Sequence, residues 1–161
     1  MTTIWITGLP ESGKTTIAKE LMKRLKNVVL LDGNIVRASL SSDLGYTIKD
    51  RDKHIKRVAD VCALITESGV TNIASVISPT KQIRDYARAI NKKFIEVYVK
   101  CPVEVCEKRD SKGNYKKFKE NIITDFVGKN IPYEEPMNPE IIVDSNKLTP
   151  KECAEAIYKK I

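Results

Sequence analysis

The chain has 161 residues, 42% of them hydrophobic and 30% charged, and its 28 Lys and Arg against 21 Asp and Glu give a net charge of +7. This length suffices for one well-buried core, so we expect a single domain over residues 1–161, and no apolar stretch approaches the roughly 20 residues that span a bilayer. The N-terminal residues lack the features of a secretory signal and the chain has no nucleic-acid-binding motif, so we expect a cytoplasmic protein with no membrane or nucleic-acid partner.

Apolar runs typical of strands alternate along the chain with segments of helical periodicity. Strands are predicted at 2–7, 27–33, 70–79, 92–102 and 140–144, and helices at 14–26, 48–69, 81–90, 102–110 and 149–161. Such alternation predicts an α/β fold in which helices cover both faces of a five-stranded parallel sheet. The four cysteines, Cys62, Cys101, Cys106 and Cys153, lie in these apolar segments without a C-x-x-C pair, so we expect buried, reduced thiols.

Residues 110–136 interrupt this alternation with a polar, lysine-rich and weakly periodic stretch. A surface loop is one interpretation. Because loops of this length in compact domains are usually functional, we favour the interpretation that this stretch is a mobile lid that covers a phosphate site. We call residues 110–136 the lid segment.

The sequence GLPESGKT at residues 8–15 fits the pattern G-x-x-x-x-G-K-[ST] between a predicted strand and a predicted helix. Glycines let backbone N–H groups point at phosphate oxygens, Lys14 can reach the β- and γ-phosphates, and Thr15 can offer its hydroxyl to Mg²⁺. The predicted phosphate-binding residues are Gly8, Pro10, Glu11, Ser12, Gly13, Lys14, Thr15 and Thr16. Glu11 is unusual in such a loop, and its negative charge beside a triphosphate predicts an effect on affinity.

A carboxylate, Asp32, ends the second predicted strand, where a doubly wound sheet builds its site. Asp32 is therefore a candidate to hold a metal ion with Thr15 and to orient an attacking hydroxyl, which makes it a catalytic candidate with Lys14. A helix N-cap is the alternative role. Arg37, Arg51, Arg57 and Arg84 offer guanidinium groups to anionic oxygens, although at least half of such a set usually lies on the surface.

From about residue 3 to residue 145 the chain resembles adenylylsulfate kinase. The likeness is carried by IWITGLPESGKTT, LLDGNIVR, SSDLGYTIKDRDKHIKRVADV, VISP, FIEVYVKCPVEVCEKRDSKGNYKK and NIPYEEPMNPEIIVD. The resemblance implies a three-layer P-loop kinase fold with a mobile lid. It also implies ATP and Mg²⁺ as cofactors and phosphorylation of the 3′-hydroxyl of adenosine 5′-phosphosulfate (APS) to give 3′-phosphoadenylylsulfate.

The resemblance also implies roles for individual residues. Arg37 and Arg51 would contact the phosphate and sulfate side of the acceptor, and Tyr46 and Phe126 would stack on the two faces of its base. The turn Ile77, Ser78 and Pro79 would line the acceptor site, while Arg109, Lys116 and Lys117 lie in segments that close over the nucleotides.

The chain departs from the family pattern on the acceptor side. Asn34 stands where the family's D-G-D-N segment has a second aspartate, and His54 replaces an asparagine, so His54 either contacts the acceptor or is a structural group. The turn after Pro79 and the lid segment also differ. Two alternatives therefore stay open: a paralogous kinase acting on cytidine diphosphoramidate, and a non-catalytic nucleotide-binding module. The sequence does not set the oligomeric state, for which a homodimer is one candidate.

Overall fold

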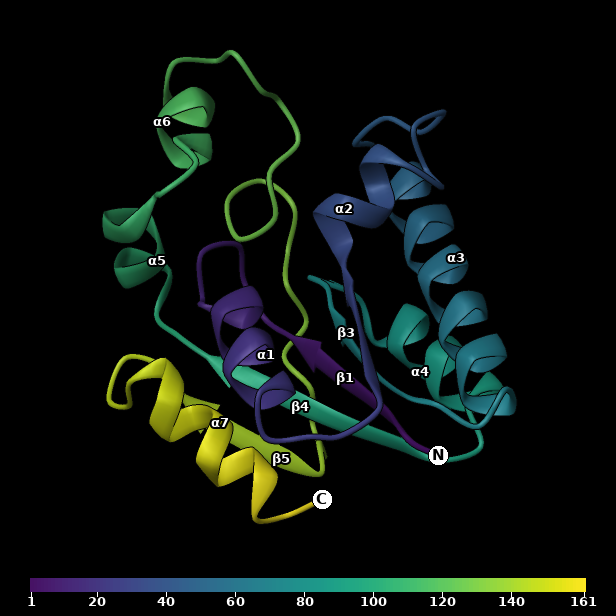
Figure 1. Cartoon of the computed structure of the whole chain (residues 1–161). Helices are drawn as coiled ribbons and strands as arrows, with labels where there is room; N and C mark the ends of the chain where they lie inside the picture. Colours follow the sequence, from purple (N-terminus) through teal and green to yellow (C-terminus); the bar gives the residue numbers. More distant parts are fainter.

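The computed structural model describes all 161 residues of the chain (Figure 1). The strands are β1 (Thr3–Thr7), β2 (Val28–Asp32), β3 (Thr71–Ser75), β4 (Phe94–Lys100) and β5 (Ile141–Asp144). The helices are α1 (Lys14–Met22), α2 (Gly33–Ala38), α3 (Ile48–Glu67), α4 (Lys81–Ile90), α5 (Val103–Arg109), α6 (Asn114–Lys119) and α7 (Pro150–Tyr158).

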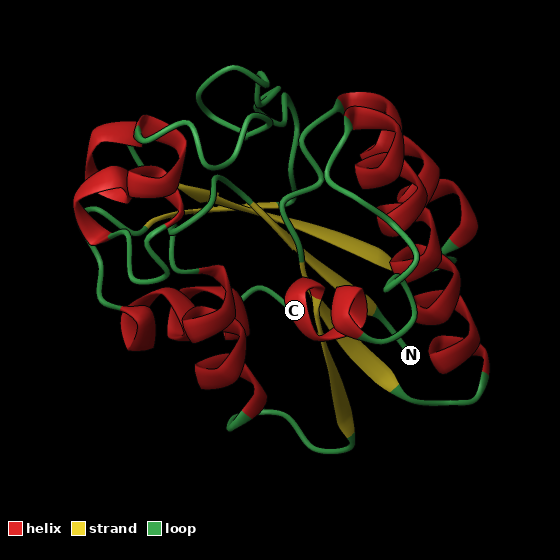
Figure 2. Ribbon diagram, turned by 90° about the horizontal axis from the view of Figure 1, so that it is seen from above, coloured by secondary structure: helices red, strands yellow, loops and turns green.

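The five strands form one sheet in the order β2-β3-β1-β4-β5, and every neighbouring pair is parallel. Helices α1 and α7 cover one face, and α3 and α4 cover the other (Figure 2). This confirms the predicted α/β architecture with a five-stranded parallel sheet. Because all strands run the same way, the loops that follow β1, β2 and β3 meet at one edge of the sheet.

The side chains of β1 pack alternately into two separate hydrophobic clusters, one on each face of the sheet. Ile4 and Ile6 pack into the cluster that includes Ile17 of α1, whereas Trp5 between them packs into the cluster on the α3–α4 face. Successive side chains of a strand point to opposite faces, so a central strand buried on both sides carries apolar residues on both faces, as Ile4, Trp5 and Ile6 do here. Trp5 is completely buried, which anchors the end of the sheet that leads into the loop after β1.

Two short helices were not predicted from the sequence. Helix α2 follows β2 directly, because Asp32 accepts a hydrogen bond from the backbone N–H of Asn34 and so caps a segment too short to show periodicity. Helix α6 lies within the lid segment and buries Tyr115. Helix α1 also ends at Met22, four residues earlier than predicted.

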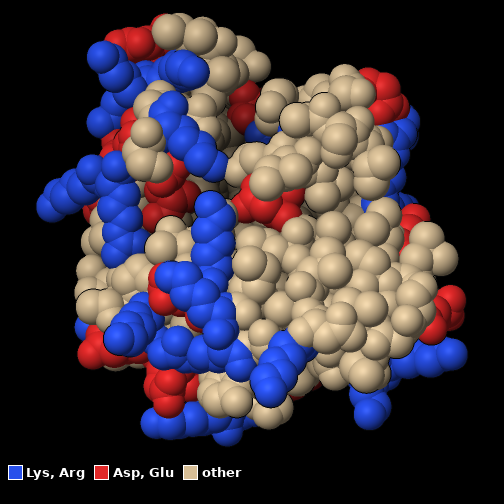
Figure 3. All heavy atoms as spheres, viewed as in Figure 1, with Lys and Arg blue, Asp and Glu red and all other residues tan.

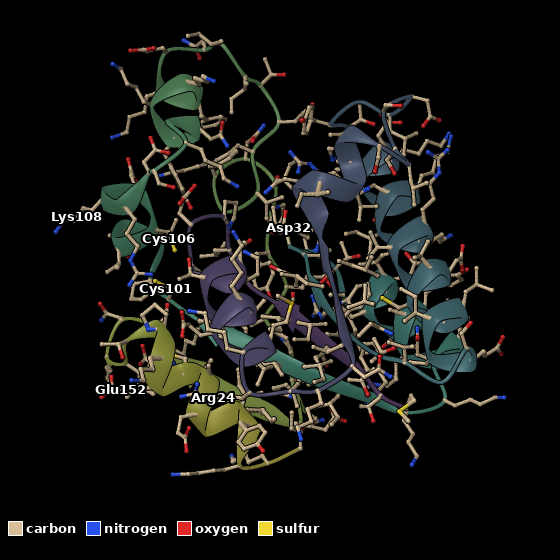
Figure 4. The ribbon with its side chains drawn as sticks, viewed as in Figure 1. Arg24, Asp32, Cys101, Cys106, Lys108 and Glu152 are labelled. Atoms are coloured by element: carbon tan, nitrogen blue, oxygen red, sulfur yellow. The ribbon has the colours of Figure 1, made fainter.

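The four cysteines are buried and unpaired, as expected, and Cys101 and Cys106 flank the junction of β4 and α5 (Figure 4). No helix of the structure combines the length and apolar character needed to cross a membrane. Basic side chains gather on the half of the molecule that carries α1 and α7 (Figure 3), where Lys23 pairs with Glu20 and Arg24 pairs with Glu155.

Candidate functional site

Residues 8–13 wrap between β1 and α1. A side chain at Gly8 would lie 2.7 Å from the carbonyl oxygen of Val99, and Gly13 adopts φ +94°, a left-handed conformation that favours glycine. Two hydrogen bonds fix the loop from outside: Ser145 Oγ donates to the Ser12 carbonyl at 2.7 Å, and Tyr115 Oη donates to the Pro10 carbonyl at 3.1 Å. These two contacts engage carbonyl groups of the loop and leave its N–H groups untouched, although the Ser12 N–H donates to the Leu9 carbonyl within the loop.

The Lys14 ammonium lies inside this loop. Its Nζ donates to the Leu9 carbonyl at 2.6 Å and lies 3.4 Å from Ser12 Oγ, and only 8% of the residue is exposed. Burial lowers the pKa of Lys14 to about 8, partly offset by the nearby negative charge of Glu11. Because burial disfavours the charged form of Lys14, an anionic partner such as a phosphate oxygen would stabilise the ammonium.

Asp32 caps α2, the alternative role that the sequence allowed it, and also contacts Thr15, while its part in metal binding and catalysis stays a prediction. Its Oδ2 accepts a hydrogen bond of 2.6 Å from Thr15 Oγ1, while its Oδ1 accepts one of 2.9 Å from the backbone N–H of Asn34. Ser75 Oγ lies 3.4 Å from the same Thr15 hydroxyl, and Ser75 is paired with Asp32 in the register of β2 and β3. Figure 4 shows Asp32 above the start of α1. Sequence reasoning missed Ser75, although its place at the end of a parallel strand was a usable signal.

Tyr46 and two arginines beside its ring form a second part of the site, which we call the wall around Tyr46. The guanidinium carbons of Arg37 and Arg51 lie 4.8 Å and 5.4 Å from the centre of its ring, and the ring is 60% exposed. Arg51 also donates from Nη2 to the carbonyl of Asp125 at 2.8 Å, which ties this wall to the lid segment. A cavity of about 160 Å³ opens beside Arg51 and reaches Pro79. Positive charge and an exposed aromatic face thus lie together, an arrangement suited to an anionic group attached to a base.

The turn Ile77-Ser78-Pro79 is held by a buried polar network. Ser78 has φ +40°, donates from Oγ to Thr7 Oγ1 at 2.9 Å, and accepts from Trp5 Nε1 at 3.1 Å. Its carbonyl accepts a hydrogen bond of 2.8 Å from Arg84 Nη1. Tyr133, which the sequence reasoning missed, shares the Thr7 hydroxyl at 2.9 Å. A network this well connected fixes a strained turn in one conformation.

Two of the four arginines that the sequence offered to anions are engaged elsewhere. Arg84 is buried, and its Nε lies 3.1 Å from Glu96 Oε1 in an ion-pair contact that lacks hydrogen-bond geometry. Arg57 pairs on the surface with Asp43. Only Arg37 and Arg51 of this set therefore belong to the wall around Tyr46.

His54 lies inside the same wall. It is 4% exposed, and its Nδ1 is 3.0 Å from Ser41 Oγ. Burial, with smaller contributions from nearby arginines such as Arg37, lowers the pKa of His54 to about 4, so the ring is neutral at pH 7. This geometry supports the structural role of His54, in which the ring joins α3 to the segment after α2; its contact with an acceptor stays a prediction.

The lid segment packs around an aromatic cluster. The ring of Phe126 lies 4.7 Å from that of Tyr115 in an edge-to-face arrangement and is 6% exposed, whereas Lys117 is exposed. Because Phe126 is buried in this cluster, its stacking on a base opposite Tyr46 stays a prediction. Arg109, at the end of α5, donates from Nη2 to the Ser145 carbonyl at 2.6 Å and so lies beside the phosphate loop.

Comparison with known proteins gives a consistent result. The model of the adenylylsulphate kinase family matches residues 1–144. An adenylyl-sulfate kinase of Clostridium kluyveri is 51% identical over 159 residues, covering 96% of this chain and 80% of the relative, and that of Saccharomyces cerevisiae is 43% identical, covering 98% and 82%.

Among solved structures, the APS kinase of Mycobacterium tuberculosis in complex with AMPPNP and APS superposes with a TM-score of 0.93. It is 32% identical in sequence, and the match covers 99% of this chain and 96% of that one. The likeness thus extends over the phosphate loop, the wall around Tyr46 and the lid segment together.

Proposed function

The chain belongs to the adenylylsulfate kinase family, and from this premise we propose that it transfers the γ-phosphate of ATP to the 3′-hydroxyl of APS, forming 3′-phosphoadenylylsulfate. The observation that carries the proposal is the match of nearly the whole chain to a kinase structure that holds AMPPNP and APS. The local geometry supports it, because Lys14, Thr15 and Asp32 meet at one edge of the sheet.

The phosphate loop is the donor half of the site. The backbone N–H groups of residues 8–13, other than Pro10, and the N-terminus of α1 would bind the phosphates of ATP, with Lys14 providing the charge nearest the transferred group. Arg109 would close over the donor from the end of α5. The first turn of α1 exposes Thr16, which we propose as a further contact with the phosphates.

Asp32 at the end of β2 and Thr15 in the first turn of α1 fit a magnesium ion. Mg²⁺ is usually held by one or two protein groups together with substrate phosphates, and the Thr15 hydroxyl and Asp32 carboxylate form such a pair, with no cluster of three or more acidic, histidine or cysteine ligands. When bound, the ion neutralises charge that develops on the phosphates. Thr15 and Asp32 would be its protein ligands.

The wall around Tyr46 is the acceptor half. Arg37 and Arg51 would bind the phosphate and sulfate oxygens, Tyr46 and Phe126 would stack on the base, and Ile77, Ser78 and Pro79 would line the site, with Lys117 and His54 as further contacts. Asp32 would orient the 3′-hydroxyl and accept its proton as the oxygen attacks in line. The lid segment would exclude water from the reacting groups.

Asn34 and His54 give a specific reason to test a second acceptor. A buried polar contact left unpaired by the wrong base discriminates strongly between substrates, and both residues alter polar groups on the acceptor side. Cytidine diphosphoramidate is the alternative acceptor. A non-catalytic binding module is the third reading, but the intact set of Lys14, Thr15 and Asp32 speaks against it.

One assay separates these functions. The protein is incubated with ATP, Mg²⁺ and, in separate reactions, APS, cytidine diphosphoramidate or a plain nucleoside diphosphate, and ADP release is followed. We expect ADP release that depends on APS. Turnover of the cytidine compound alone would overturn the proposal. If none of the acceptors supports ADP release, the result would favour a binding module. Light scattering of the same preparation would test whether the chain forms the candidate homodimer.

A further inference from the structure

Glu11 has a backbone conformation that its side chain disfavours. It lies in the middle of the phosphate loop with φ +62°, in the left-handed region where a residue with a Cβ is strained and glycine is not. Glycine at this position would remove the strain and also the negative charge beside the phosphates. A residue that is unfavourable on both counts calls for an explanation in the contacts of its side chain.

Those contacts lead out of the loop. Ser111 Oγ donates a hydrogen bond of 2.8 Å to Glu11 Oε2, and Arg109 Nη1 approaches the Glu11 backbone carbonyl at 3.5 Å. Ser111 is exposed and lies between α5 and α6, at the start of the lid segment. The Lys14 ammonium, in contrast, points to the Leu9 carbonyl inside the loop. The carboxylate is thus held on the outer side of the loop, while the side chain that binds phosphate points inward.

We propose that Glu11 is a positioning residue: the hydrogen bond from Ser111 holds its carboxylate away from the phosphate-binding hollow, and so couples the affinity of the loop for a nucleoside triphosphate to the position of the lid segment. This inference deepens the proposed function and rests on it only in requiring that the loop bind nucleotide. Released from Ser111, the carboxylate is free to rotate toward the phosphates, where it repels them.

The proposal predicts that the effect of Ser111 on the affinity for AMPPNP depends on the charge of Glu11. With Ser111→Ala, the charge is released, and we expect the dissociation constant for AMPPNP to rise about fivefold, which corresponds to the net contribution of one typical hydrogen bond. With Glu11→Gln, the charge is removed, and we expect the dissociation constant to fall about threefold at low salt. In the Glu11→Gln background, Ser111→Ala should then change the dissociation constant by less than about twofold, because no charge remains to be released.

The experiment is a double-mutant cycle on the full chain, with AMPPNP binding in the presence of Mg²⁺ measured by isothermal titration calorimetry. Ser68→Ala is the matched control for the lost hydroxyl, since Ser68 Oγ makes an equally exposed hydrogen bond to the Leu64 carbonyl at the far end of α3. Glu67→Gln is the control for the change in net charge. Both controls should leave the dissociation constant unchanged, and circular dichroism checks that each variant is folded.

A second readout distinguishes positioning from simple loop damage. Release of a charge is screened by salt, so the effect of Ser111→Ala should shrink between 50 and 500 mM NaCl, whereas damage to the loop would persist. Equal effects of Ser111→Ala in both backgrounds, or no effect in the wild-type background, would overturn the proposal. Failure of the wild-type chain to bind AMPPNP would overturn it together with the proposed function, whereas binding without APS turnover would overturn the proposed function alone.

Discussion

The hydroxyl of Thr15 and the carboxylate of Asp32 are joined by a hydrogen bond of 2.6 Å across the ends of α1 and β2. The second oxygen of the same carboxylate caps α2. One side chain therefore fixes both the start of the helix that leads to Arg37 and the geometry of the hydroxyl next to Lys14. The roles of its two oxygens can be tested separately by mutation, because asparagine also caps helices whereas alanine does not.

Replacing Asp32 should separate catalysis from folding. Asp32→Asn keeps an N-cap oxygen and should leave the free energy of unfolding within about 0.5 kcal/mol, while Asp32→Ala should lower it by about 1 kcal/mol. Both variants should lose at least about 100-fold in kcat, because neither side chain carries the charge that, in the proposed function, orients the hydroxyl and accepts its proton. Urea unfolding and APS-dependent ADP release measure the two effects. Near-normal kcat in Asp32→Asn would remove Asp32 from the catalytic role.

The affinity for ATP should depend on pH through Lys14. The pKa of Lys14 in the free protein is about 8, and the charged form binds phosphate, so the dissociation constant for AMPPNP should rise about tenfold per unit as the pH increases above 8. The contribution of Lys14 to the free energy of unfolding has the opposite dependence on pH. It grows as the pH rises from about 8 toward 10.5, because there the unfolded chain binds the proton more tightly.

Calorimetric titrations at several pH values test this dependence. Lys19→Met, which removes an exposed lysine of the same helix, should keep the pH profile of the wild-type protein. Lys14→Met should weaken binding and flatten the profile. A wild-type affinity that stays constant from pH 7 to pH 9.5 would contradict the lowered pKa.

His54 should make the fold sensitive to acid. Its pKa is about 4 in the folded protein and 6.5 in the unfolded chain, so the unfolded state binds the proton more tightly and stability is lost as the pH falls below 6.5. By pH 5 the loss from this group should be about 2 kcal/mol. His54→Asn cannot titrate, so the difference in unfolding free energy between the variant and the wild type should change by that amount between pH 7.5 and pH 5. A difference that is independent of pH would show that His54 has the same pKa in the folded and the unfolded state.

The buried pair of Arg84 and Glu96 should affect stability mainly because removal of one partner leaves the other charge buried and unpaired. Arg84→Met leaves a buried carboxylate with only the contact of Arg88 at 3.3 Å, and we expect a loss of about 3–5 kcal/mol in unfolding free energy. The double variant Arg84→Met/Glu96→Gln should lose less than the sum of the single variants, because no charge is left unpaired.

Denaturant unfolding of the single and double variants measures this coupling. Arg57→Met is the matched control, because its pairing with Asp43 is exposed, and it should cost less than about 1 kcal/mol. The turn at Ser78 should also loosen in Arg84→Met, since it loses the hydrogen bond to its carbonyl, and KM for APS should rise more than kcat falls. Additive losses in the double variant would contradict the coupling.

Much of the fold follows from local pattern. The parallel sheet and the helices on its two faces were predicted because β1, β3 and β4 lie in runs rich in apolar residues and the helices between them carry periodic apolar positions. Helices α2 and α6 were missed because six residues are too few to show a period. The first depends on a cap whose carboxylate serves the site as well, and the second depends on the burial of Tyr115.

The sequence by itself determined the phosphate loop, since the spacing of Gly8, Gly13, Lys14 and Thr15 is a property of consecutive residues. It also determined the sheet, because alternation of elements and apolar strands is local information. Only the tertiary structure decided that Asp32 meets Thr15 and Ser75, that Arg84 is buried against Glu96, and that Ser111 binds Glu11 across 100 residues. These contacts depend on which strands become neighbours, and strand neighbours are chosen by packing of the whole core, which no short stretch of sequence encodes.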